Sequence, residues 1–185
     1  MHFVLDGRVK VCRYFGDMRE IILDLVPHGQ FASFQPILDV PDEVEYAECV
    51  KPSVIVQVNA GIVKDLMEQN AGFSSFMFQQ LANRYNKINS RLSLVHPTVL
   101  IRKQIVTLLL ELAANFGRSV GEEVIIEHGL SQHEMACMIH RTRQSVTGVL
   151  RKLKRANLIN YTRTSILVRD MEKLKDWGGI GAIHR

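Results

Sequence analysis

The first third of the chain alternates between short apolar runs and turn-forming residues. Each run is only a few residues long and rich in β-branched side chains, and turn pairs such as Asp6-Gly7 separate the runs. Regularly spaced short strands of this kind predict a barrel-like or sandwich-like β-domain. The expected strands are centred on Phe3–Leu5, Val9–Val11, Ile21–Val26 and Val54–Val58.

From about residue 61 the apolar spacing becomes helical. Apolar side chains recur at intervals of three and four residues, as in the a/d seam of a coiled coil. The seam residues are Phe78, Leu81, Tyr85, Ile88, Leu92 and Val95. Polar residues between them, including Arg84 and Arg91, suit solvent. Such a helix either lies on its own β-domain or pairs with a second copy, and the strict seam with its wide polar faces favours the dimer.

The pair His96-Pro97 ends this helix, because proline cannot continue a helix interior and restricts the residue before it. A second helix is expected from Ile101 to about Asn115, followed by a short strand at Val124–Ile126. The chain is therefore expected to divide into a β-domain (1–72), a dimerisation helix (73–96) and a C-terminal domain (97–185).

Two short amphipathic helices with a tight connection follow in the C-terminal domain. Ser131 and Glu134 have the spacing of a capping box, and Thr142 is the next expected N-cap. Only His140 and Arg141 separate the two helices, so the pattern predicts a helix-turn-helix. Two further strands around the polar turn 162–165 predict a wing behind it.

The outward face of the second short helix carries residue types that commonly contact DNA. Arginine can donate two hydrogen bonds to the edge of a guanine, and glutamine can pair with adenine in the same way. Hydroxyls and lysines can reach phosphates. Taken alone, a short basic helix is explained about as well by a solvated surface. The wing that follows it favours DNA.

The charge distribution agrees with a polyanionic partner. Residues 131–185 carry 11 Lys and Arg against four Asp and Glu, a net charge of +7, whereas residues 1–130 have a net charge of −3. The three cysteines are scattered, so neither a disulfide framework nor a zinc ribbon is expected. No signal peptide, membrane span, metal-ligand pattern, cofactor or catalytic constellation is recognisable, and a non-enzymatic cytoplasmic protein is expected.

The segment from Leu130 to Ile159 resembles the winged helix-turn-helix of the cyclic-AMP receptor protein/fumarate-nitrate regulator (Crp/Fnr) family. The positions that carry the resemblance are Ser131, Ala136, Arg143, Val146, Leu150 and Leu158-Ile159. The resemblance implies an α+β protein: an N-terminal cyclic-nucleotide-binding-like β-roll, a long dimerisation helix and a C-terminal winged helix-turn-helix. The resemblance also implies that the chain begins inside the roll, so either a truncated form or an incomplete barrel repaired by dimerisation is expected.

The resemblance also implies a set of DNA-contacting residues. Arg143 would contact a base edge, Gln144 stands where many relatives carry Glu, and Ser131 and Ser145 would touch phosphates. The full expected set is Ser131, Gln132, Thr142, Arg143, Gln144, Ser145, Thr147, Arg151, Lys152 and Arg163. Two departures stand out: His140 replaces a usual glycine of the turn, and Gly148 replaces a basic residue of some relatives, which implies one base contact fewer.

The expected ligand segment departs from that of cyclic-nucleotide-binding relatives. Ser33-Phe34 stands in place of a Gly-Glu pair, and Glu45 in place of the arginine that holds the phosphate. A carboxylate there would repel the phosphate, so no response to cyclic AMP is expected. The leading hypothesis is a homodimeric transcription regulator on a palindromic DNA site, with RNA polymerase as a partner by resemblance. The alternative is a dimeric interaction protein with a degenerate roll and no DNA partner.

Overall fold

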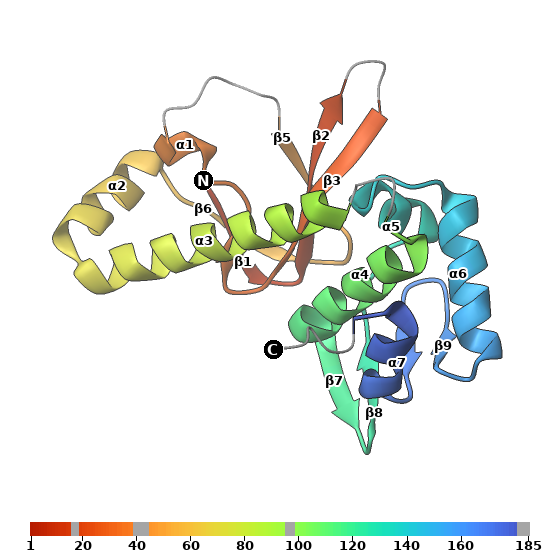
Figure 1. Ribbon diagram of the computed structural model, residues 1–185. Coiled ribbons are helices and arrows are strands. Elements are labelled where there is room, and N and C mark those ends of the chain that lie inside the picture. Colours follow the sequence, from red (N-terminus) through yellow and green to blue (C-terminus); the bar gives the residue numbers. More distant parts are fainter. Residues whose placement is uncertain (16–18, 39–44, 95–98, 181–185) are drawn as a thin grey trace. The chain divides into compact units, whose positions relative to one another are not determined.

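The computed structural model describes residues 1–15, 19–38, 45–94 and 99–180 (Figure 1). The chain divides into two compact units, Met1–Ser90 and Arg91–Arg185. Together they form a mixed α+β fold, as expected: β-sheets, a long helix, and a helix-turn-helix with a small sheet. Within the described residues, no helix combines the length and the apolar character needed to cross a bilayer.

The N-terminal unit contains two three-stranded antiparallel sheets, ordered β4-β1-β6 and β3-β2-β5. The first expected strands are present, and Gly7 turns β1 into β2 with a φ of +97°, a conformation that favours glycine. The strands are β1 (His2–Asp6), β2 (Arg8–Phe15), β3 (Arg19–Pro27), β4 (Gln30–Phe31), β5 (Glu45–Cys49) and β6 (Val54–Gln57). Residues 39–44, which precede β5, lie outside the described residues.

Valines from both sheets form the interior of this unit. Val4 on β1 is buried against Val9 and Val11 on β2 and Val26 on β3, so the two sheets share one apolar core. The helices are α1 (Gln35–Leu38), α2 (Ala60–Gln69) and α3 (Ala71–Leu94). The sequence pattern did not separate α2 from α3; Asn70 divides them, and its side chain caps the new helix by accepting from the N–H of Phe73 (2.9 Å).

The C-terminal unit packs its helices beside a four-stranded antiparallel sheet, ordered β7-β8-β10-β9 (Figure 1). Its buried core includes Leu109 and Leu112 on α4 and Leu150 and Leu153 on α6. The elements are α4 (Ile101–Phe116), β7 (Gly117–Val120), β8 (Glu123–Ile126), α5 (Gln132–Met138), α6 (Arg143–Arg155), β9 (Ile159–Tyr161), β10 (Ile166–Val168) and α7 (Met171–Gly178). Strand β7 and helix α7 were not anticipated from the sequence.

Candidate nucleic-acid interface

The two short helices begin where the capping chemistry predicts. The backbone N–H of Glu134 donates to Ser131 Oγ (3.2 Å) and the N–H of Ser131 donates to Glu134 Oε2 (2.7 Å), which completes the capping box of α5. Thr142 caps α6 by accepting from the N–H of Ser145 (3.2 Å). The expected N-caps are therefore confirmed, and both phosphate-contact candidates, Ser131 and Ser145, take part in them.

The turn between α5 and α6 is held from two sides. His140 has a φ of +53°, in the left-handed region where glycine is the unstrained choice. The next residue, Arg141, donates through its backbone N–H to Ala136 O (3.0 Å) and through Nε to Gln104 Oε1 on α4 (2.8 Å). Gln104 is only 1% exposed, so a buried amide fixes the turn that sets the direction of α6.

Titration of His140 is coupled to this turn. Partial burial of the imidazole, together with the positive charge of Arg91, lowers the pKa of His140 below its ordinary value near 6.5. Both causes disfavour the protonated form, so a proton taken up by His140 works against the folded turn.

Helix α6 presents a polar, basic face opposite its buried side. Val146, Val149, Leu150 and Leu153 are buried, as expected. The exposed residues of the helix are Arg143, Gln144, Gly148, Arg151, Lys152, Lys154 and Arg155. Among the described residues, no ion pair engages Arg143, Arg151 or Lys152, so the charges of this face are available to an anionic partner.

Two of the expected DNA contacts also bind each other within the protein. The Thr147 hydroxyl donates to Gln132 Oε1 across the two helices (2.5 Å) and lies 2.9 Å from the backbone oxygen of Arg143. Both Gln132 and Thr147 are half-buried. Their first role is to join α5 to α6, a pairing across 15 residues that sequence spacing could not have shown.

The wing has the expected form. Strands β9 and β10 pair in register around residues 162–165, where the hydroxyls of Thr162 and Ser165 lie 2.7 Å apart. Arg163 is exposed in this turn. Next to this turn, at the end of β9, the Lys154 ammonium lies 5.5 Å from the centroid of the Tyr161 ring, within cation–π range.

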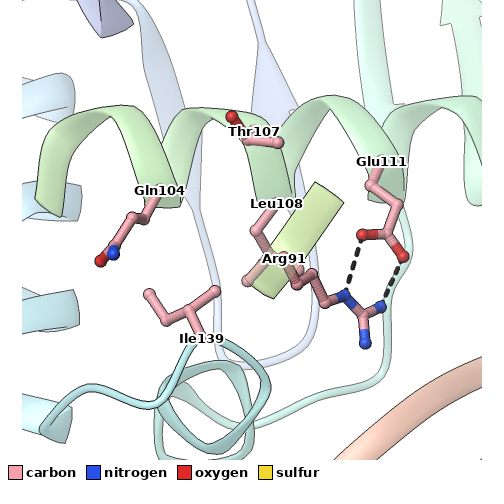
Figure 2. A pocket seen from close by; sticks show the side chains of 6 residues that line it. All are labelled: Arg91, Gln104, Thr107, Leu108, Glu111 and Ile139. Atoms are coloured by element: carbon pink, nitrogen blue, oxygen red, sulfur yellow. Dashed lines mark hydrogen bonds and ion pairs between the residues drawn. The ribbon is translucent and has the colours of Figure 1, made fainter. Parts of the chain in front are cut away.

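The C-terminal unit also contains a bidentate ion pair, which joins the final turn of α3 to α4 (Figure 2). The Arg91 guanidinium reaches both carboxylate oxygens of Glu111, at 2.6 and 3.2 Å. The space beside it, between Gln104 and Ile139, measures about 10 Å³. That is roughly the room needed by one water molecule, so this hollow is not a ligand site.

The structure describes the side chains of four of the six expected seam residues of α3. Phe78 and Tyr85 are 71% and 63% exposed, and Leu81 and Ile88 are half-buried. A shallow groove of about 520 Å³ beside them is lined by Ser74, Ser75, Phe78, Gln79 and Ala82. The side chain of Leu92 and the whole of Val95 lie outside the described residues.

The expectation that Arg84 and Arg91 face solvent was wrong. The Arg84 side chain is 11% exposed, and it donates to the backbone oxygen of Ala32 on the roll (2.7 Å). Arg91 is 9% exposed and pairs with Glu111. Long basic side chains can bury their stems while their charged ends find acceptors, so a polar residue between seam positions need not face solvent.

The N-terminal unit holds a cavity of about 290 Å³ between its two sheets. Its walls are largely apolar, and they include Val9, Val11, Ala32, Ser33, Glu45 and Ile55. The Glu45 carboxylate, 13% exposed, lies 3.2 Å from Arg13 Nη2 and 4.0 Å from Arg84 Nη2, and it accepts from Ser33 Oγ (3.3 Å). Among the described residues that line this cavity, Glu45 supplies the carboxylate, and two arginines already match its charge.

The cysteines carry no metal cluster: among the described residues, no group of three or more ligating side chains could hold an ion. Cys12 is fully buried, and burial together with the neighbouring Glu20 carboxylate raises the pKa of its thiol to about 12. A thiol that stays protonated is a poor nucleophile, so Cys12 acts as a small core residue.

The helix-turn-helix, its wing and the basic face of α6 are the features of a DNA-binding protein, and comparison with known proteins shows which proteins the chain is similar to. Residues 103–177 match the Crp-like helix-turn-helix domain. A "CRP-like cAMP-activated global transcriptional regulator" of Mycobacterium tuberculosis is 24% identical over 177 residues, which cover 94% of this chain and 77% of the relative. The "Global nitrogen regulator" of Synechocystis is 25% identical over 173 residues, covering 92% of this chain and 76% of the relative.

Solved structures agree on the fold. FixK2 from Bradyrhizobium japonicum superposes with a TM-score of 0.80 at 15% identity, covering 95% of this chain and 85% of FixK2. A CooA mutant from Carboxydothermus hydrogenoformans gives a TM-score of 0.76 at 21% identity, over 96% and 78% of the two chains. Residues 103–177 therefore form a Crp-like helix-turn-helix domain, and over nearly its whole length the chain is similar to transcription regulators of the Crp/Fnr family.

Proposed function

We propose that this regulator acts as a homodimer in the cytoplasm, on a palindromic DNA site that it reads through α6. In this proposal Arg143 and Gln144 contact base edges, whereas Ser131, Ser145, Arg151, Lys152 and the wing residue Arg163 contact phosphates. The observation that carries the proposal is the exposed face of α6, whose arginines and lysine point away from the buried core without an ion-pair partner among the described residues. Thr142, Gln132 and Thr147 shape the face and lie at its edge.

The dimer is proposed to form through the seam of α3. Phe78 and Tyr85 leave most of their aromatic surface exposed, next to the groove on the same helix. Large exposed aromatic side chains at heptad spacing are typical of a helix that pairs with another helix. The three-part organisation of residues 1–72, 73–96 and 97–185 belongs to the same proposal, as does RNA polymerase as the partner that receives the signal.

The roll is proposed not to respond to cyclic AMP. A cyclic nucleotide phosphate entering the cavity would meet the Glu45 carboxylate, whose cationic neighbours Arg13 and Arg84 are already engaged. At about 4 Å and an effective dielectric constant near 20, two like charges repel by about 4 kcal/mol. Pairing with Arg13 and Arg84 lowers this repulsion, but it also engages the two arginines that could otherwise bind the phosphate. The M. tuberculosis relative is cAMP-activated by its name, so this difference separates the two proteins.

Selection of bound fragments from a random duplex pool tests the proposal. The wild-type chain should enrich an imperfect palindrome with half-site centres about 34 Å apart, one helical turn of DNA. If three cations per subunit contact phosphates, log Kd should change with log salt with a slope of magnitude roughly 5. Cyclic AMP at millimolar concentration should leave the affinity unchanged. No enriched sequence would refute the DNA site, and tighter binding with cyclic AMP would refute the ligand proposal.

A further inference from the structure

Gln104 is a polar residue on the buried side of α4. It is only 1% exposed, and it lies beside Ile105 and one turn before Leu108, both of which are buried. Burying an amide costs free energy unless its polar atoms form hydrogen bonds. An apolar side chain of similar size would avoid this cost, so the amide at this position calls for a structural reason.

Arg141, in the turn between α5 and α6, supplies that reason. Its Nε donates to Gln104 Oε1 (2.8 Å), and a hydrogen bond from a charged donor is roughly twice as strong as one between neutral groups. Arg141 is half-buried and directly precedes Thr142, the N-cap of α6. The bond therefore ties the start of α6 to α4.

The turn needs support from outside because its backbone conformation is unfavourable for the residue it contains. The N–H of Arg141 donates to Ala136 O (3.0 Å), the bond that closes a Schellman motif at the end of α5. Such a motif places a left-handed residue just after the helix, usually a glycine, and here that residue is His140 with a φ of +53°. A residue with a Cβ is strained in this conformation, so contacts around the turn must hold it in place. The bond from Gln104 is such a contact, because it acts on the residue directly after His140.

We propose that Gln104 is a positioning residue for DNA reading: through Arg141 it holds the turn where a glycine would otherwise be needed, and so sets the direction of α6. Arg143, the first residue of α6, follows Arg141 by two positions, so a shift of the turn would move the side chain that is proposed to read a base edge. Hydrogen bonds to a base weaken steeply when their alignment is lost. Gln104 is buried, so it acts on DNA through the turn and not by contact. This role rests on the proposed function, in which α6 reads the DNA.

Gln104→Met tests the role, because methionine has a similar size and suits a buried site but lacks the amide acceptor for Arg141. The measured quantity is base discrimination: the dissociation constant for a duplex with one base pair changed in each half-site, divided by that for the selected palindrome. Discrimination should fall about tenfold, whereas the affinity for unrelated duplex at low salt should change less than about threefold, because phosphate contacts tolerate a small shift of the helix. Gln104→Glu keeps an acceptor oxygen and should retain discrimination. Thr107→Ala, at a half-buried position one turn further along α4, is the matched control and should also leave discrimination unchanged.

A second substitution, His140→Gly, separates positioning from a general contribution to stability. If Gln104 does the work of a turn glycine, the double variant Gln104→Met/His140→Gly should recover discrimination to within about threefold of the wild type, because glycine holds the left-handed turn without strain. Circular dichroism at the assay temperature verifies that each variant is folded. Where Gln104→Met alone does not fold, the double variant decides, and it should both fold and discriminate.

Two results overturn the positioning role alone. One is a folded Gln104→Met protein with wild-type discrimination, which would leave Gln104 a purely structural residue. The other is a loss of discrimination that His140→Gly does not restore. In both cases discrimination by the wild type and by Thr107→Ala limits the failure to Gln104. A wild-type chain with no sequence preference overturns the proposed function, and the role of Gln104 with it.

Discussion

Replacing Phe78 by Glu should convert the protein from a dimer to a monomer without unfolding it. Phe78 is 71% exposed within one chain, so its ring contributes little to the core of its own subunit. The variant places a charge at the seam of α3, where the proposed partner helix would bury the ring. The variant should therefore affect the pairing of two subunits while leaving the folding of each subunit intact.

The size of the effect follows from the exposed area. An aromatic side chain buries roughly 150–250 Å², so the exposed 71% of Phe78 corresponds to roughly 110–180 Å². At about 25 cal/mol per Å², each copy contributes roughly 3–4.5 kcal/mol to pairing, and a two-fold interface contains two copies. Losing both weakens the dimer by at least ~10⁴-fold, which moves a nanomolar dissociation constant to about 10 µM.

Sedimentation velocity at about 1 µM protein measures the result. The wild-type chain should sediment with twice the 21.1 kDa chain mass, and Phe78→Glu with the mass of one chain. Leu5→Glu is the control, because Leu5 is 57% exposed but lies on β1. A Phe78→Glu protein that remains dimeric, or a wild type that is monomeric at this concentration, would refute the reasoning. Loss of the circular-dichroism melting transition would instead show that Phe78 supports the fold.

Three further predictions concern the local chemistry of the fold. His140→Asn should keep the free energy of unfolding at pH 7 within about 0.5 kcal/mol, because Asn tolerates a positive φ. Because the folded pKa of His140 is lowered, the unfolded state binds more protons below about pH 6.5, so wild-type stability should fall on acidification. Denaturant titrations at pH 7 and 5 should show a smaller fall in the variant, and an equal fall would contradict the coupling. Ser131→Ala should cost about 1 kcal/mol in urea unfolding, whereas Ser131→Asp keeps a capping oxygen; equal stability of the two would count against the capping box. Iodoacetamide at pH 8 should alkylate the exposed Cys49 and spare Cys12, and mass-spectrometric modification of Cys12 in the folded protein would contradict its raised pKa.

The elements of the C-terminal domain could be predicted from sequence because they depend on patterns between near neighbours in the chain. The capping box at Ser131, the N-cap at Thr142 and the period of Val146 and Leu150 are all set by neighbours within one or two turns. Such patterns depend on backbone chemistry that tertiary packing rarely overrides. The bounds of α5 and α6 and the strands of the wing were accordingly predictable.

Long-range contacts were not predictable. The bond from Arg141 to Gln104 joins residues 37 apart in the chain, and Thr147 meets Gln132 across 15 residues. Periodicity placed Arg84 on a solvent-facing side, but the roll provides a carbonyl acceptor, and the side chain turns inward. The repulsion expected from Glu45 was likewise derived without Arg13. The strand near Arg13 could be predicted from the sequence, but its pairing with the strand that contains Glu45 could not.

Sequence discrimination by Arg143 tests the central claim most directly. With the selected palindrome and single-base variants as ligands, Arg143→Ala should lower discrimination at one base pair by about 10- to 100-fold, the equivalent of roughly 1–3 kcal/mol. Lys152→Ala, the matched control on the same face, should weaken all sequences alike and reduce the magnitude of the salt slope by about 2, because the dimer carries two copies of the contact. Retention of full discrimination by Arg143→Ala, with affinity untouched by either change, would contradict the claim that α6 reads DNA.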